Sequence, residues 1–323
     1  MKTLKRLLCG LGVSMICSGA SLAADAYPTR PITLVNPYAA GGPADVLGRA
    51  LARELEKQLG KPVIVENKAG GGAAIGANFV ARAKPDGYTL LLGTSAAHVV
   101  TPLMQRTAYD GIKDFAFVTI VANQPNMLVV RSSLPVSTLP ELIALARKEP
   151  GKINYASAGP GSSPHLGGEL FRQQAKVDIM HIPYSGAAPA INDLVGGQVD
   201  MAVLNLAASV QFIRSGKLKA LAYANPKRSA LFPDVPTLAE AGVSGAESAS
   251  WYSLAAPKGT PQAVLEKLNK AVQAVNQSPE YRKLMDAQGV ELWTLTPQEA
   301  TQYVEKDQLA MRKLVDSAGL TKK

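Results

Sequence analysis

The feature that most limits the possible folds of this chain is a regular alternation of strand-like and helix-like segments. Apolar runs rich in β-branched residues predict strands at 32–35, 63–65, 89–92, 117–121, 127–130, 153–156, 179–182, 199–204 and 218–223. Between them, apolar residues recur at helical spacing, and the first such segment places Leu47, Leu51, Leu55 and Leu59 on one face. Further helices are predicted at 73–83, 139–148, 165–174, 189–195 and 207–214. Strands that alternate with helices of about 10–15 residues are typical of mostly parallel sheets flanked by helices, so we predict an α/β fold.

Two connections between strands lack a helix, and they suggest how the chain divides. Only residues 122–126 separate the strands at 117–121 and 127–130, and a further strand at 250–256 follows a loop rich in Gly, Ser and Ala. Two long crossing strands would join two lobes with a ligand cleft between them. We predict lobe 1 from residues 27–122, lobe 2 from 123–248, and completion of lobe 1 by 249–323. One continuous doubly wound domain is the alternative.

The C-terminal part changes from alternating strands and helices to helices alone. Three helices are predicted after the strand at 250–256. Each begins with a hydroxylated residue followed by proline, the expected start signal, at Thr260-Pro261, Ser278-Pro279 and Thr296-Pro297. We expect these helices to cover a lobe that is already built.

Residues 1–26 have the organisation of a secretory signal peptide. Three basic residues precede an apolar run over residues 7–17 that is too short to span a bilayer, and small residues follow it. Cleavage is expected after Ala23 or after Ala26, with a slight preference for Ala26. An uncleaved membrane anchor is the alternative, but we expect an exported protein.

Cysteine content and charge narrow the classes of function. Cys9 and Cys17 both lie in the signal segment, so the mature chain has no disulfide and no cysteine ligand for a metal. The formal net charge is +9, but the basic residues are scattered and aromatic residues make up only 6% of the chain, which argues against nucleic-acid binding. A mild positive field suits an anionic small molecule. No metal and no cofactor are predicted.

Four loops that follow predicted strands share a composition of small, hydroxylated and glycine residues. They cover residues 38–43, 93–98, 157–165 and 184–189, and each is predicted to precede a helix. In parallel α/β sheets, ligands bind beyond the carboxyl ends of the strands. Helix N-termini present free N–H groups and the positive end of the helix dipole, so loops of this kind are typical of anion sites.

The glycine patterns do not match the common nucleotide motifs. The first loop, within VNPYAAGGPAD, has neither the P-loop lysine nor a third glycine at dinucleotide spacing. Gly71 and Gly76 have Walker spacing, but Ala77-Asn78 follow instead of Lys and Ser or Thr. We interpret residues 70–76 as a turn that opens the helix at 73–83 and could rim the cleft.

Several polar residues allow either a structural or a catalytic interpretation. Asp45 falls at the third position of the first helix, where a carboxylate can order the preceding loop; a general base is the alternative. The third loop contains Ser162, Ser163 and His165, so a secreted hydrolase remains the competing function, although the loop lacks the G-x-S-x-G pattern. We expect Ser163 to cap the following helix, with His165 in its first turn.

The other two histidines show no metal-ligand spacing between themselves or with His165. We interpret His98 as a donor in the second loop and His181 as a strand residue.

A series of short motifs then suggests a family. In chain order these are Tyr27-Pro-Thr-Arg-Pro-Ile32, Gly41-Gly42-Pro-Ala-Asp45, Pro62-Val-Ile-Val-Glu-Asn67, Pro85-Asp-Gly-Tyr-Thr-Leu90, Gly151-Lys-Ile-Asn-Tyr-Ala-Ser157, Gly161-Ser-Ser-Pro-His-Leu166, His181-Ile-Pro-Tyr184 with Gly186, Asp234-Val-Pro-Thr237 and Glu240-Ala-Gly242. Together they cover essentially all of the mature chain. The chain resembles the Bug-type extracytoplasmic solute-binding proteins of tripartite tricarboxylate transporters.

The resemblance implies a two-lobed, type II-like periplasmic binding fold that closes on a small carboxylate, and no enzymatic activity. It implies delivery of the ligand to integral membrane transporter subunits, or a report to a sensor kinase, and we expect a monomer. Backbone amides and hydroxyls of the first and third loops would hold the carboxylate, with His165 nearby. With the other loops and Asn205, the expected ligand-binding residues are Tyr38, Ala39, Ala40, Gly41, Gly42, Asp45, Thr94, Ser95, Ala158, Gly159, Ser162, Ser163, His165, Tyr184, Gly186 and Asn205.

One position departs from the family pattern. The family often has an Asp-Asn pair where this chain has Leu204-Asn205. An acid at this place would pair with the ammonium group of an amino acid. Leu204 therefore favours a plain or aromatic carboxylate as the ligand.

Overall fold

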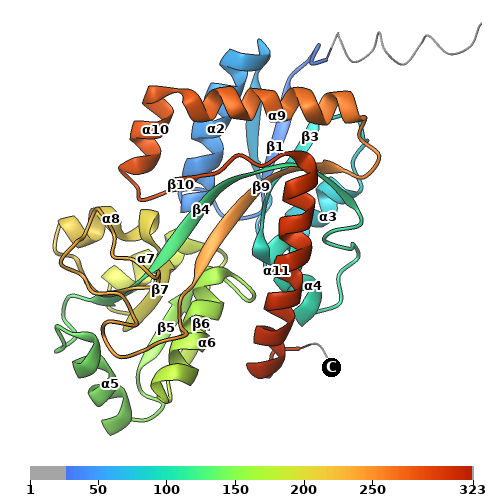
Figure 1. The fold of residues 1–323 in the computed structure, drawn as a ribbon. Helices are drawn as coiled ribbons and strands as arrows, with labels where there is room; N and C mark the ends of the chain where they lie inside the picture. The colour runs from blue at the N-terminus through green and yellow to red at the C-terminus, as the bar shows by residue number, and fades with distance from the viewer. Residues whose placement is uncertain (1–26, 322–323) are drawn as a thin grey trace, which may run out of the picture.

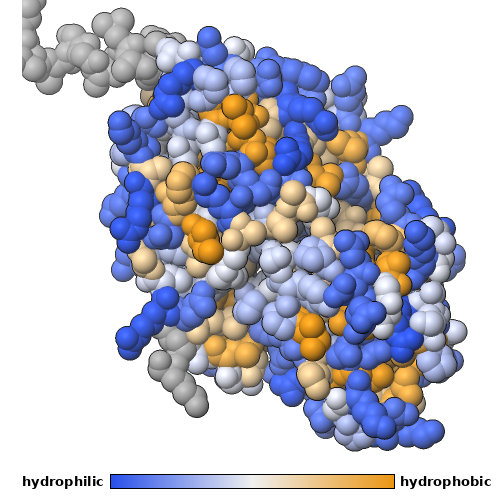
Figure 2. Space-filling view, turned by 180° about the vertical axis from the view of Figure 1, so that it is seen from behind, coloured by the Kyte–Doolittle hydropathy of each residue, from blue (hydrophilic) through white to orange (hydrophobic). Residues whose placement is uncertain are grey.

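The computed structural model describes residues 27–321 as two α/β lobes joined by two long strands, β4 (Phe115–Arg131) and β9 (Ala249–Pro257) (Figure 1). The predicted signal peptide lies outside the described residues. No helix in the described range is long and apolar enough to cross a membrane. Seen from behind, the surface is mostly hydrophilic, with hydrophobic side chains in separate small groups (Figure 2).

The first lobe is built on a sheet with the strand order β2-β1-β3-β9-β4. Strands β1 (Ile32–Asn36), β2 (Val63–Asn67) and β3 (Thr89–Thr94) pair in parallel, whereas β9 and β4 pair antiparallel, and the short β10 (Glu291–Leu292) pairs with β4. The helices of this lobe are α2 (Pro43–Leu59), α3 (Ala74–Ala81), the π-helix η1 (Ala96–Val100), α4 (Thr101–Met104), α9 (Gln262–Gln277), α10 (Pro279–Asp286) and α11 (Pro297–Ser317). The predicted leucine stripe of α2 is buried except at its last member, and α9 packs beside it.

The second lobe is built around the other half of β4. Strands β5 (Asn154–Ser157), β6 (Met180–Pro183) and β7 (Met201–Asn205) pair in parallel, while β7 and β8 (Leu218–Tyr223) flank β4 in antiparallel fashion. The helices are α5 (Leu139–Lys148), α6 (Ser163–Ala175), α7 (Ala187–Val195) and α8 (Leu206–Arg214). The predicted α/β class and the two-lobed periplasmic binding fold are confirmed, but the linking strands make each sheet mixed rather than mostly parallel.

The largest difference from the predicted strands is that β4 runs without a break through residues 122–126. Pro125 lies where β4 changes partner: it is the last residue paired with β9, at Ala249, and Asn126 is the first paired with β7. A proline lacks an N–H donor, so it is tolerated at such a change of partner. The division after residues 122 and 248 falls inside β4 and just before β9, and it remains our proposal.

The second predicted loop is absent, because η1 follows β3 almost directly. His98 is therefore not a loop donor: it is fully buried, with Nδ1 2.7 Å from the Gly111 carbonyl oxygen and Nε2 3.0 Å from Oγ of Ser253. Phe115, Phe117 and Trp251 surround the ring. Burial lowers the pKa of His98 to about 4, and the backbone hydrogen bond only partly opposes this.

The predicted helix starts are confirmed in two of three cases. The hydroxyl of Ser278 accepts from Tyr281 N–H, and Thr296 forms a full capping box with Glu299. Thr260 was predicted to cap α9 but does not: its hydroxyl donates to the Pro257 carbonyl at 2.8 Å, and Pro261 occupies the cap position.

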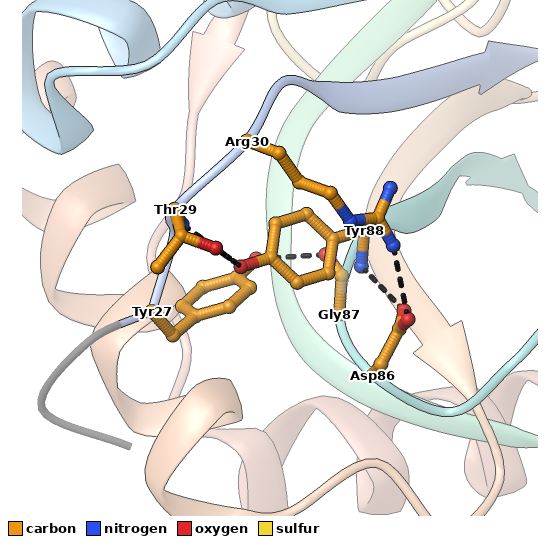
Figure 3. Close-up of polar contacts among 6 residues, drawn as sticks. All are labelled: Tyr27, Thr29, Arg30, Asp86, Gly87 and Tyr88. Atoms are coloured by element: carbon orange, nitrogen blue, oxygen red, sulfur yellow. Dashed lines mark hydrogen bonds and ion pairs between the residues drawn. The ribbon is translucent and has the colours of Figure 1, made fainter. Parts of the chain in front are cut away.

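Two of the motifs that suggested the family lie against each other at the N-terminus of the described chain (Figure 3). The Tyr27 hydroxyl donates to the Gly87 carbonyl at 2.7 Å, and the Tyr88 hydroxyl accepts from Thr29 N–H at 2.9 Å. Arg30 pairs with Asp86 and lies 3.9 Å from the centre of the Tyr88 ring. The turn over residues 84–88 thus anchors the first residues that the structure describes.

Candidate functional site

A small cavity of about 30 Å³ lies between the lobes, where the N-termini of α2, α6 and α7 meet the linking strands. This volume leaves room for little more than one water molecule. The wall consists of Tyr38, Gly42, Pro43, Ala44, Thr94, Ala158, Ser162, Ser163, Pro164, Ala187, Asn205, Ser250 and Tyr252.

The electrostatic character of this cavity comes from backbone rather than from charged side chains. No residue of its wall carries a formal charge. The first N–H groups of a helix have no intrahelical acceptor, and the helix dipole places partial positive charge at the same end. Three such ends around one small volume favour a negatively charged group.

The first loop is held in shape by Asp45. One carboxylate oxygen accepts from Gly41 N–H at 3.0 Å and from Arg49 at 2.9 Å, and the other accepts from Asn67 at 2.9 Å. Burial alone would raise the pKa of Asp45, but these hydrogen bonds outweigh it and lower the pKa. With both oxygens engaged, Asp45 fits the predicted role of ordering the loop better than that of a general base.

The third loop differs by one residue from the predicted capping. Ser162, not Ser163, is the N-cap of α6, with its Oγ accepting from His165 N–H at 3.3 Å. Ser163 Oγ is thereby free to accept from Asn126 Nδ2 on β4 at 2.7 Å. The loop is therefore tied to the linking strand through Ser163.

His165 lies behind the third loop rather than in the cavity. Its Nδ1 accepts from Gly161 N–H at 3.2 Å, and its ring stacks on His181 with centroids 4.2 Å apart. Burial, and secondarily the neighbouring His181, lower the pKa of His165 to about 4. His181 is on β6, as predicted, and its Nε2 lies 2.7 Å from Ser157 Oγ.

The cavity wall brings together part of the predicted set of ligand-binding residues. Those in the wall are Tyr38, Gly42, Thr94, Ala158, Ser162, Ser163 and Asn205. Those outside it are Ala39, Ala40, Gly41, Asp45, Ser95, Gly159, His165, Tyr184 and Gly186. Ser95 points elsewhere and donates to Asp307 of α11, and the Tyr184 hydroxyl donates to Asp193.

Two wall residues on β9, Ser250 and Tyr252, were not predicted from the sequence. Both side chains point to the same face of β9, because residues two apart on a strand share a face. The alternation of residues along this strand could therefore have predicted that the two lie together. Pro43, Ala44, Pro164 and Ala187 also line the wall, as the first residues of the three helices.

Amide side chains connect the cavity wall to the linking strands. Asn205 Nδ2 lies 2.8 Å from Asn126 Oδ1, 3.1 Å from Ser250 Oγ and 3.2 Å from the Gln124 carbonyl. The Tyr252 hydroxyl donates to Gln124 Oε1 at 3.1 Å, and burial raises the pKa of Tyr252. A group bound in the cavity would contact the same residues that hold the two linking strands together.

The lobes touch at two places beside the cavity. A Cβ added at Gly186 would lie 3.2 Å from Ala39 Cβ, which brings the first and fourth loops together. A Cβ added at Gly72 would lie 2.5 Å from the Pro160 carbonyl oxygen, so the glycine turn does rim the cleft. The cleft is thus closed, and a ligand larger than the cavity requires it to widen.

Comparisons with known proteins match this architecture over most of the chain. Residues 47–320 match the family model described as "Tripartite tricarboxylate transporter family receptor". Protein BugT of Bordetella pertussis is 38% identical over 303 residues, covering 93% of each chain. The solved periplasmic binding protein BugD is 37% identical, with a TM-score of 0.89 over 92% of this chain and 100% of its own.

Two further solved structures hold named ligands. Rhodopseudomonas palustris Rpa4515 with adipate is 36% identical, with a TM-score of 0.89 over 92% of this chain and 100% of its own. MatC from the same organism, with bound malate, is 34% identical, with a TM-score of 0.86 over 90% of this chain and 100% of its own.

Proposed function

Because this chain belongs to the tripartite tricarboxylate transporter receptor family, we propose that it is a periplasmic solute-binding protein for a small organic carboxylate. It captures the carboxylate between its lobes and presents it to a transporter of the tripartite tricarboxylate type. Reporting to a sensor kinase is the second role for the same binding event.

The observation that carries this proposal is the convergence of three helix N-termini on a cavity without charged side chains. Hydrogen bonds to a charged group contribute about 1.5–3 kcal/mol each, and a micromolar ligand needs about 8 kcal/mol net. Several backbone N–H groups, with the hydroxyls of Ser162 and Ser163, supply that without an arginine. Adipate in Rpa4515 and malate in MatC are both small carboxylates, which supports the same ligand class here.

The cavity wall also bears on the type of carboxylate. Leu204 is fully buried in the second lobe, and no acidic side chain lines the cavity. An ammonium group placed there would have no anionic partner, and the helix N-termini would repel it. The ligand we propose is therefore a plain or aromatic carboxylate rather than an amino acid.

The competing hydrolase is disfavoured by the geometry around His165. A Ser–His pair needs an imidazole nitrogen that accepts the serine proton. Nδ1 of His165 already accepts a backbone N–H, and Ser162 Oγ serves as a helix cap. The solved relative BugD is named as a binding protein, which also supports binding without turnover.

The test is a panel of carboxylates on the purified chain without residues 1–26, followed by isothermal titration calorimetry and NMR of the recovered ligand. Adipate, malate, benzoate and glutamate represent the classes to be separated. We expect saturable heat with at least one plain or aromatic carboxylate, weaker heat with glutamate, and recovery of the compound unchanged. Turnover of the ligand, or no binding across the panel, would contradict the proposal.

A charge variant tests the site itself. Ser163→Asp places a carboxylate in the cavity wall at a helix N-terminus, where the helix dipole stabilises a negative charge, and should abolish binding by repulsion. Thr138→Asp makes the same charge change at the cap of α5 in the second lobe and should leave affinity unchanged. Equal affinity of the two variants would remove this cavity from the site.

Export is tested separately by fractionation and N-terminal sequencing. We expect the processed chain in the periplasmic fraction, beginning at Tyr27 or at Ala24. A chain that keeps Met1 and sediments with membranes would instead indicate the uncleaved anchor.

A further inference from the structure

A second and larger cavity, of about 250 Å³, lies on the opposite face of the linking strands from the carboxylate cavity. Successive side chains of a strand point to opposite faces. On β9, Ser250 and Tyr252 therefore line the first cavity, while Ala249 and Trp251 line the second. Helix α11, which runs beside these strands in Figure 1, forms much of its outer wall.

The carboxylate of Asp307 faces this second cavity, and within the described chain only one of its two oxygens accepts hydrogen bonds. Asp307 Oδ2 accepts from Ser95 Oγ at 2.9 Å and from Trp251 Nε1 at 3.0 Å. Within residues 27–321, no donor and no cation pairs with its Oδ1, and no Lys or Arg lines the cavity. Glu247 adds a second carboxyl group to the wall. The wall therefore repels anions and offers a free acceptor to a hydrogen-bond donor.

Aromatic and apolar side chains form much of the rest of the wall, beside the polar residues Asn123, Ser163 and Ser248. Trp251 is 3% exposed, and its ring meets that of Tyr303 edge to face at 5.8 Å. Leu166, Leu170 and Met311 add aliphatic side chains to the lining. Aromatic rings beside a carboxylate stabilise an ammonium group, and the aliphatic side chains suit a hydrocarbon body.

We propose that this cavity is a second binding site, which takes a small primary amine in its protonated form carried on an apolar or aromatic body. The ammonium group donates to Oδ1 of Asp307, and the hydrocarbon part packs between α6 and α11. The volume lies just below that of sites for drug-sized ligands, which fits a compound of modest size.

The position of this cavity ties it to the first one. Its wall includes Leu166 and Leu170 from the second lobe, Tyr303 and Asp307 from the first, and Trp251 on a linking strand. Ser163 lines both cavities. A compound that fits the closed arrangement better than an open one shifts the lobes toward closure, and by linkage it changes carboxylate affinity.

The test uses 2-phenylethylamine as the probe and 3-phenylpropanoate as its anionic counterpart, titrated by NMR at pH 7 without any other ligand. We expect the amine to perturb the indole signal of Trp251 saturably and the anion to leave that signal unchanged. Asp307→Asn keeps the shape of the side chain but removes its charge, and it should weaken amine binding at least tenfold. Glu305→Gln, on the exposed side of the same helix, makes the same change of charge and should bind the amine normally.

A second variant keeps the test decisive if Asp307→Asn does not fold. Met311→Trp fills the cavity and should also abolish amine binding, while each variant is checked by thermal unfolding. Amine binding that is equal in Asp307→Asn and the parent chain, or absent up to millimolar concentration, would overturn the second site. The titration contains no carboxylate, so its result is independent of the proposed function; a repeat with a bound carboxylate measures the linkage.

Discussion

Gly72→Ala offers a selective way to disturb closure of the lobes. In the closed arrangement the new Cβ would lie 2.5 Å from the Pro160 carbonyl oxygen, which belongs to the opposite lobe. A backbone oxygen cannot swing aside as a side chain can. The clash with Pro160 disappears when the lobes separate, whereas a second contact, 2.9 Å from Thr101 Oγ1 in the same lobe as Gly72, is present in both states. The Pro160 contact therefore penalises the closed state in particular.

The size of the effect has two parts. Gly72 has φ of +63°, so alanine there costs about 1–2 kcal/mol of stability whether the lobes are open or closed. The contact with Pro160 adds the cost of overpacking, about 1–3 kcal/mol, in the closed state alone. If the lobes keep this contact when the cavity widens around the ligand, this second cost weakens affinity roughly 5- to 150-fold.

The assay compares Gly72→Ala with Gly60→Ala as a matched control. Gly60 ends α2 with φ of +67°, and a Cβ added there meets no atom within 4 Å. Both variants should unfold at a lower temperature than the parent chain, but only Gly72→Ala should show weaker carboxylate binding by calorimetry. Unchanged affinity in Gly72→Ala, or equal loss in both variants, would refute the idea that Gly72 limits closure.

Three further outcomes follow from contacts described above, two at the first cavity and one around the buried His98. Ser162→Ala removes the cap of α6 and should cost about 1 kcal/mol in the free energy of unfolding, measured by urea titration. Ser163→Ala should weaken carboxylate binding roughly tenfold or more in calorimetry, because it removes one hydrogen bond to a charged ligand; no change would exclude that contact. The buried His98 and His165 both have a pKa of about 4, so the unfolded chain binds protons first as the pH falls below about 6.5 and stability falls; His98 contributes about 3 kcal/mol of this loss between pH 6.5 and 4. His98→Gln should remove that share and so reduce the slope of stability against pH, and an unaltered slope would contradict the role of His98.

Most of the fold could be predicted from the sequence because the patterns that indicate its helices and strands are local. The leucine stripe of α2, the proline at its first position and the alternation of segments each depend on neighbours within a few residues. The break predicted around Pro125 was wrong because β4 exchanges one partner strand for another at that point. No local pattern reports which strands will lie on either side.

The site could be predicted only in part, because some of its contacts join residues that are far apart in the sequence. Glycine-rich loops and helix starts indicated the N-termini that meet at the first cavity. Ser95 and Asp307 are 212 residues apart, and their hydrogen bond depends on where α11 packs. Because η1 follows β3 almost directly and α11 packs beside it, the Ser95 side chain points toward α11. The second cavity lies between the same elements, so the sequence did not predict it either.

The place of β9 has a consequence for the order in which the chain can fold. This strand lies between β3 and β4, although more than a hundred residues separate it from either. Until residues 249–257 are present, β3 and β4 each keep an unpaired edge, whereas the strands of the second lobe are all available by residue 223. A chain that is synthesised from its N-terminus would therefore assemble the second lobe first and complete the first lobe last. Loss of the C-terminal segment would leave the earliest part of the chain unfinished, and with it one wall of the cleft.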